Sequence, residues 1–326
     1  ETLTNYDLDI YTPRVGVGSP PVLATVHVAA VNYDPSLKLP AKMDWAKVRR
    51  FLKGTWPLPP PEIHREIDEG MFDTESAWDT EYVPEAEWLL RFSVATVKGR
   101  VYVIENKSGM VASFRRACRG LDVLPKENQV GLYLRLVNGV WHSAHADAAP
   151  TLRVFTQNAN ADLLYLARLF PQGTVIALED AMLAHSVLHG GFPHSLDYQA
   201  SLHASINRHK HLDRTNPVVY SGMDAFVQLE VWRATEKELT SDSRSAKVYR
   251  ERVLPLIPII QEAEDAGVRI DQSEVARGVG YLTQEVIEAE RTAQAASGYK
   301  LNLGSSVQVG RQLFGLEGLK SPRGKR

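Results

Sequence analysis

The sequence predicts an α/β protein with a mixed sheet, followed by a purely helical region. The first observation is a series of three apolar, β-branched runs separated by short turn-like stretches, at 75–83, 88–97 and 100–106. The second is an alternation of strand and helix further along the chain, at 151–157, 161–170, 174–178 and 180–188. Three antiparallel strands followed by this alternation are the element order of a ribonuclease-H-like mixed sheet with flanking helices, and we expect that fold class.

The remaining elements fit around this sheet. A helix is expected at 110–121, and a hairpin at 131–141 is expected to turn at Asn138-Gly139. Asn216 and Pro217 form a strong helix start, so the next helix is predicted to begin there. After a polar break come three further helical patterns, at 248–267, 273–296 and 305–315, and the prolines at 255 and 258 must start or kink the first of them.

The N-terminal residues differ in composition from the rest. They contain a strand candidate at 22–31, an amphipathic helix candidate at 44–54 and a proline-rich spacer at 57–61. We therefore expect three regions: an N-terminal segment at 1–66, an α/β domain at 67–240 and a helical region at 241–326.

Composition narrows the class of protein. The chain has 326 residues and a formal net charge of −2, so any binding of nucleic acid must depend on local basic patches. Its single cysteine, Cys118, excludes an internal disulfide framework and suits a reducing compartment. No apolar run approaches the roughly 18–20 residues that span a bilayer. We expect a cytoplasmic protein that does not bind a membrane.

Two Asp-x-Glu pairs precede the second predicted strand. They are Asp73/Glu75 and Asp79/Glu81, and on a strand the two acids of each pair point to the same face. Carboxylates held this close repel each other unless a cation lies between them, and a divalent metal ion with oxygen ligands is the usual partner. A short link from Asp79/Glu81 to the following strand favours that pair, because hairpin connections are short. Asp73/Glu75 stays open as the alternative pair.

Two further motifs supply the missing acids. Asn158 and Asp162 follow a predicted strand, and Tyr220 and Asp224 are four residues apart, on one face of a predicted helix. Hydrolysis of a phosphodiester requires an activated water and a stabilised leaving oxygen, which two divalent ions bridged by carboxylates provide. The order of these motifs predicts a two-metal nuclease site.

The same set of motifs, D-x-E, N-x-x-x-D and Y-x-x-x-D, resembles the DEDD-type 3′→5′ exonucleases of the tyrosine subclass. The stretches at 179–203, 254–271 and 301–319 resemble segments of family A DNA polymerases, in a bacteriophage-like form, that lie in the exonuclease domain and the start of the thumb. The resemblance implies an exonuclease domain at 67–240 and a partial thumb at 241–326. The polymerase signatures of the family are absent from this sequence, so palm and fingers are expected in a longer chain.

The resemblance also implies roles for individual residues. Asp79, Glu81, Asp162 and Asp224 would hold two Mg²⁺ or Mn²⁺ ions, Tyr220 would position the attacking water, and Asn158 would contact DNA. The expected substrate is a single-stranded or frayed 3′ end of DNA, and residues 1–66 are a candidate docking segment for a replisome partner. The expected location is the bacterial cytoplasm, including that of a phage-infected host. The alternative is a catalytically silent exonuclease-like module that binds DNA or positions a polymerase.

Overall fold

A computed structural model of the chain describes most of the residues that the argument needs. The described residues are 10–11, 22–23, 29–34, 37–54, 60–67, 73–83, 88–107, 110–118, 131–144, 152–204, 206, 209–298, 300, 302–316 and 318. The chain divides into two compact units, Glu1–Asp265 and Ala266–Arg326. The domain bounds predicted at 67 and 241 stay predictions.

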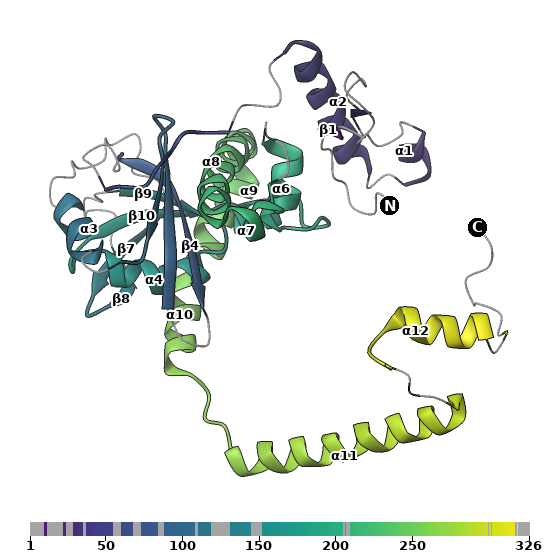
Figure 1. The fold of residues 1–326 in the computed structure, drawn as a ribbon. Coiled ribbons are helices and arrows are strands. Elements are labelled where there is room, and N and C mark those ends of the chain that lie inside the picture. Colours follow the sequence, from purple (N-terminus) through teal and green to yellow (C-terminus); the bar gives the residue numbers. More distant parts are fainter. Residues whose placement is uncertain are drawn as a thin grey trace. The chain divides into compact units, whose positions relative to one another are not determined.

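The first unit is built on one large mixed sheet (Figure 1). Its eight strands are β3 (Ile63–His64), β4 (Glu75–Val83), β5 (Trp88–Thr96), β6 (Val101–Glu105), β7 (Leu132–Val137), β8 (Val140–Ser143), β9 (Leu152–Thr156) and β10 (Val175–Asp180). In space they follow the order β3-β6-β5-β4-β9-β10-β7-β8. Two short strands, β1 (Ile10–Tyr11) and β2 (Val22–Leu23), pair with each other separately.

The strand directions confirm the predicted fold class. β4, β5 and β6 are antiparallel neighbours, while β9 runs parallel to β4 and β10 runs parallel to β9. The predicted hairpin is present between β7 and β8, and its turn residues Asn138 and Gly139 both have positive φ angles, as a two-residue type I′ turn requires. β4 is central, hydrogen-bonded on one side to β5 and on the other to β9.

Helices pack against the sheet. The described helices of the first unit are α1 (Ala30–Tyr33), α2 (Lys38–Leu52), α3 (Met110–Cys118), α4 (Ala159–Leu169), α5 (Ala181–Leu188), α6 (Leu196–His203), α7 (Leu212–Thr215), α8 (Pro217–Ser241), α9 (Ser243–Val248), the π-helical turn η5 (Tyr249–Val253) and α10 (Leu256–Ala266). α8 packs on β4, β5 and β6, and α4 packs on β4. The predicted start of α8 is confirmed, since the side chain of Asn216 accepts a hydrogen bond from the Val219 amide.

Aromatic side chains show how the sheet is held between helices. Trp78 of β4 is fully buried, and its ring lies 5.6 Å from that of Phe114 on α3 and 5.3 Å from that of Phe170. Trp232 of α8 stacks on Phe155 of β9 with ring centroids 5.4 Å apart. Because side chains alternate along a strand, Trp78 and its neighbour Asp79 point to opposite faces of β4. Asp79 therefore faces α8.

The segment after α8 also packs on the sheet. Tyr249 of η5 is fully buried, and its hydroxyl accepts a hydrogen bond from the Asp180 amide at 2.8 Å. The predicted helix at 248–267 is interrupted at Pro255, as expected for a proline inside a helical pattern, and α10 begins after it. The second unit contains α11 (Gln272–Ser297), α12 (Ser306–Gly310) and the π-helical turn η6 (Arg311–Leu316).

Two expectations for the N-terminal residues are wrong in part. The strand predicted at 22–31 is present only as β2, while Ala30–Tyr33 form α1, where the Asp34 amide donates to the Ala30 carbonyl at 2.9 Å. α2 begins at Lys38, six residues before the predicted start, because Pro40 falls in its first turn, where a missing amide costs nothing. Residues 24–28, and 55–59 of the predicted proline-rich spacer, lie outside the described residues. Among the described helices, none has the length and apolarity to cross a membrane.

Candidate metal centre

Three carboxylates from distant parts of the chain meet beside the sheet. Asp79 and Glu81 point to one face of β4, and Asp224 lies on α8, which crosses that face. One carboxylate oxygen from each of the three lies within 4.8 Å of the others. Each gap is short enough for a single cation to contact all three groups, because divalent ions bind oxygen at about 2.0–2.6 Å.

Asp162 is the fourth acid of this group. It lies in the first turn of α4, is 4% exposed, and its Oδ1 accepts hydrogen bonds from the Thr80 amide at 3.1 Å and the Thr80 hydroxyl at 2.6 Å. Thr80 stands between Asp79 and Glu81, so these bonds attach the start of α4 to the acidic part of β4. We call Asp79, Glu81, Asp162 and Asp224 the acid cluster.

The electrostatics of the acid cluster are unfavourable without a cation. Burial, and then repulsion from Asp162, Asp224 and Glu81, raise the pKa of Asp79 well above its usual value. Burial, and then repulsion from Asp224, raise the pKa of Glu81, and Arg91 opposes this shift. Burial raises the pKa of Asp162 to about 7, although the hydrogen bonds from Thr80 lower it. These shifts mean that the protein stabilises the negative charges poorly by itself.

One atom of the acid cluster has no partner. Among the described residues, Oδ2 of Asp79 is buried and accepts no hydrogen bond, while Oδ1 is 3.5 Å from Nε2 of Gln228. A buried carboxylate oxygen without a donor is costly. The donor set consists of carboxylate oxygens, which hard divalent ions such as Mg²⁺ and Mn²⁺ prefer. The residues present therefore fit a divalent metal ion.

Tyr220 lies beside the acid cluster, one helical turn before Asp224. Burial, and then the negative charge of Asp224 and a hydrogen bond with it, raise the pKa of Tyr220. The phenol is thus neutral over the physiological range and able to donate its proton in a hydrogen bond. The structure brings together Asp79, Glu81, Asp162, Tyr220 and Asp224, the five residues assigned to catalysis from the sequence.

Asn158 is separate from this group. It is exposed and lies immediately before α4 with a φ of 71°, and its side chain does not cap the helix. Asp180 takes that role instead, because its Oδ2 accepts a hydrogen bond from the Ala159 amide at 2.6 Å. The predicted contact between Asn158 and DNA stays a prediction.

The alternative pair is surrounded by basic groups. Asp73 lies 2.5 Å from Nζ of Lys98, and Glu75 lies 3.1 Å from Nη1 of Arg153. Arg153 is itself 4% exposed and also contacts Glu179 at 3.0 Å and Glu236 at 2.6 Å. Each acid of the alternative pair thus has a cation from the protein, whereas the acid cluster is short of positive charge.

Three contacts of the acid cluster were not predicted from the sequence. Nε2 of His209 lies 2.6 Å from Oδ1 of Asp224, Gln228 approaches Asp79, and Arg91 donates to Ser221 at 3.0 Å while facing Glu81 across the β4–β5 ladder. Gln228 was detectable, because it is one helical turn beyond Asp224. Arg91 also had a signal, since hairpin register places it opposite Glu81. His209 precedes the helix in a loop and had no periodic signal.

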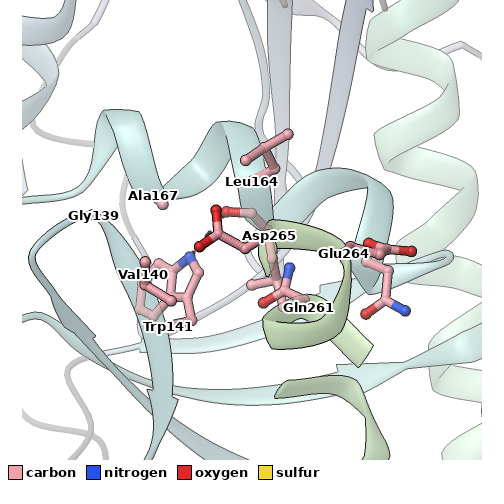
Figure 2. A pocket seen from close by; sticks show the side chains of 10 residues that line it. Gly139, Val140, Trp141, Leu164, Ala167, Gln261, Glu264 and Asp265 are labelled. Atoms are coloured by element: carbon pink, nitrogen blue, oxygen red, sulfur yellow. Dashed lines mark hydrogen bonds between the residues drawn. The ribbon is translucent and has the colours of Figure 1, made fainter. Parts of the chain in front are cut away.

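A cavity of about 290 Å³ lies on another side of α4 (Figure 2). Its lining comes from the β7–β8 hairpin, from α4 and from α10: Gly139, Val140, Trp141, Asn160, Leu163, Leu164, Ala167, Gln261, Glu264 and Asp265. No member of the acid cluster is in this lining. The cavity is therefore distinct from the candidate metal centre.

Comparison with known proteins gives a distant similarity. No family model matches the chain. A DNA polymerase I from Rhizobium leguminosarum is 31% identical over 100 residues, which cover 31% of this chain and 10% of the polymerase. The chain thus matches about a tenth of the length of this curated relative.

Two solved structures were also found by their fold. A structure described as the apo form of the nuclease is 13% identical, with a TM-score of 0.44, and the match covers 64% of this chain and 95% of that one. Brucella melitensis NrnC with bound Mg²⁺ is 15% identical, with a TM-score of 0.39 and coverage of 64% and 92%. The similarity in sequence to DNA polymerase I is therefore limited to about a third of the chain.

Proposed function

We propose that the first unit is a metal-dependent 3′→5′ exonuclease that removes nucleotides from single-stranded or frayed DNA ends. The observation that carries this proposal is the convergence of three carboxylates within 4.8 Å, with a buried Asp79 oxygen that has no partner. The motifs D-x-E, N-x-x-x-D and Y-x-x-x-D, and the partial similarity to DNA polymerase I, support the reaction type.

The acid cluster would hold two divalent ions, Mg²⁺ or Mn²⁺. When bound, such ions activate a water and stabilise the leaving 3′ oxygen. The neutral hydroxyl of Tyr220, hydrogen-bonded with Asp224, orients the attacking water. Thr80 holds the carboxylate of Asp162 with two hydrogen bonds, and His209 fixes one oxygen of Asp224. These contacts restrict the carboxylates to one arrangement before the substrate arrives.

The larger context is also part of the proposal. Similarity to DNA polymerase I suggests an exonuclease region of a family A polymerase, with residues 67–240 as the nuclease, residues 241–326 as the start of a thumb, and palm and fingers elsewhere in a longer chain. Residues 1–66 would dock a replisome partner. A bacterial cytoplasm, including that of a phage-infected cell, is the proposed location.

Cleavage of 5′-labelled single-stranded DNA tests the activity. We expect stepwise shortening that requires Mg²⁺ or Mn²⁺ and stops in chelator. Asp224→Asn should reduce the rate by at least about 100-fold, which corresponds to the loss of about 2.7 kcal/mol of transition-state stabilisation. Shortening that survives in this variant would refute the assignment.

A matched pair of variants tests which Asp-x-Glu pair acts. Glu81→Gln and Glu75→Gln remove one charge each from neighbouring positions on β4. We expect Glu81→Gln to lose cleavage and Glu75→Gln to retain it when both proteins are assayed well below their melting temperatures. The opposite result would assign the metal to Asp73/Glu75.

A catalytically silent module is the second candidate. It is favoured by the contact between His209 and Oδ1 of Asp224 at 2.6 Å, since a hydrogen bond there occupies a potential ligand atom. This candidate predicts binding of single-stranded DNA without metal-dependent shortening. Recovery of cleavage in His209→Ala would show that the histidine blocks the site.

A further inference from the structure

A groove separate from the acid cluster lies between α2 and the helices α5, α6 and α8. Its volume is about 950 Å³. Its lining residues are Leu39, Lys42, Met43, Ala46, Arg49, Arg50, Lys53, Leu188, His189, Leu202, His203, Ala234, Lys237, Glu238, Ser241 and Asp242. α2 comes from the N-terminal part of the chain, and it packs on α6. We call this feature the basic groove.

The charges of the basic groove are unbalanced. Five Lys and Arg side chains line it, against two carboxylates. Lys42, Arg49, Lys53 and Lys237 are exposed, and within the described part of the chain they form no ion pair. A concave surface lined by one sign of charge concentrates counter-ions of the opposite sign.

The two carboxylates of the groove are already engaged. Glu238 lies 2.8 Å from Nε2 of His189, and a hydrogen bond from this histidine lowers the pKa of Glu238. Asp242 caps α9, where its Oδ1 accepts from the amides of Arg244 and Ser245, each at 3.1 Å. These acids are therefore poor partners for the groove's cations, and those cations remain available to an anionic ligand.

The basic groove and the acid cluster share helix α8. Lys237 follows Asp224 by thirteen residues, which is about 20 Å along the axis of an α-helix. A nucleic-acid strand at about 3.4 Å per nucleotide bridges this distance with roughly six nucleotides. Apolar side chains such as Leu39, Met43 and Leu202 lie between the cations and offer contact surface for sugars and bases.

We propose that the basic groove binds the phosphate backbone of the nucleic-acid strand whose 3′ end lies in the acid cluster. This inference rests on the proposed function for the position of the 3′ end. The groove would hold the strand several nucleotides away from the cleaved bond, so that repeated cleavage occurs before the strand dissociates. It also gives α2, from the N-terminal segment, a contact with the substrate.

The test measures binding of a fluorescent single strand of about twelve nucleotides, twice the bridging length, by the full chain in EDTA at several salt concentrations. Arg49→Gln/Lys53→Gln removes two cations of the groove. Arg135→Gln/Arg252→Gln is the matched control, since both arginines are exposed, lie outside the groove lining and have no ion pair in the described residues. We expect the slope of log affinity against log salt to decrease by about 1.4 in the groove variant, at about 0.7 for each lost phosphate contact, and to stay at the wild-type value in the control.

Further arms make the outcome decisive. Lys237→Gln changes a different helix and should decrease the slope by about 0.7, which excludes misfolding of α2 as the cause. With Mg²⁺, the KM for the long strand should rise relative to the KM for a dinucleotide in the groove variant. Equal slopes in all variants would overturn the proposal, and so would competition by poly-glutamate that exceeds competition by DNA, because the groove would then bind an acidic peptide. Salt-dependent binding through the groove without any cleavage would support this inference and refute the proposed function.

Discussion

Arg153 allows a prediction whose size follows from its contacts. This arginine is almost completely buried, and its guanidinium contacts Glu75, Glu179 and Glu236 within 3.1 Å. Replacing it by methionine keeps most of the packing against Phe155 but leaves Glu179, which is fully buried, short of positive charge. Removing one partner of a buried ion pair costs about 3–5 kcal/mol.

The expected loss is at the lower end of that range. Arg250 lies 3.8 Å from Glu179 and remains as a weaker partner, so we expect Arg153→Met to reduce the free energy of unfolding by about 3 kcal/mol at pH 8. Burial already raises the pKa of Glu179, and loss of Arg153 raises it further. A carboxyl group whose folded-state pKa is raised contributes stability below its unfolded pKa and loses it as pH rises, so the deficit should shrink at pH 5.

Urea denaturation of the wild type, Arg153→Met, Glu179→Gln and the double variant, at pH 5 and pH 8, measures these effects. The double variant should be more stable than Arg153→Met, because the unpaired charge has been removed. A loss below about 1 kcal/mol for Arg153→Met at pH 8, or a double variant that is less stable than Arg153→Met, would refute the reasoning.

Three further expectations concern the acid cluster and the histidines. Tyr220→Phe should lower kcat by about 10- to 100-fold without changing DNA binding in EDTA, because it loses one hydrogen bond to a charged group; an unchanged kcat would remove Tyr220 from the mechanism. The raised pKa of Asp162, about 7, means that the metal-free protein gains stability from protonation at low pH and loses it as pH rises through 7. The increase in melting temperature on adding Mg²⁺ should therefore be larger at pH 8 than at pH 5.5, and an equal increase would contradict this. Burial, with repulsion from neighbouring histidines, lowers the pKa of His185 to about 3, so its neutral form contributes stability that is lost as pH falls below its unfolded value of about 6.5; His185→Gln should flatten this part of the stability curve.

The elements of the sheet were predictable because their patterns are local. β4, β5 and β6 are apolar runs bounded by turn residues, and Asn216 with Pro217 marks the start of α8 in the sequence itself. The spacing of Tyr220 and Asp224 identified a helix face, because helical periodicity is also local. The mixed topology then followed from the order of strands and helices.

The partners of the acids were not predictable, because they come from distant parts of the chain. Asp73/Glu75 and Asp79/Glu81 have the same spacing, and only the fold shows that Lys98 and Arg153 lie beside the first pair. The contact between Asp224 and His209 depends on a loop without periodicity. The early start of α2 was missed because Pro40 was not considered as a first-turn residue.

The buried phenol of Tyr249 has a consequence for how the chain can be divided. Its hydroxyl is the acceptor for the Asp180 amide and donates in turn to the Asp180 carbonyl at 3.2 Å, while Asp180 caps α5 and holds the start of α4. A protein cut after α8 would leave that amide buried without a partner, at a cost of about 1–3 kcal/mol, and would open the core where Leu254 and Ile257 are buried. The smallest autonomous nuclease therefore has to include the turn η5 and the first residues of α10, so that the sheet keeps a closing segment which the length of a polymerase domain would not suggest.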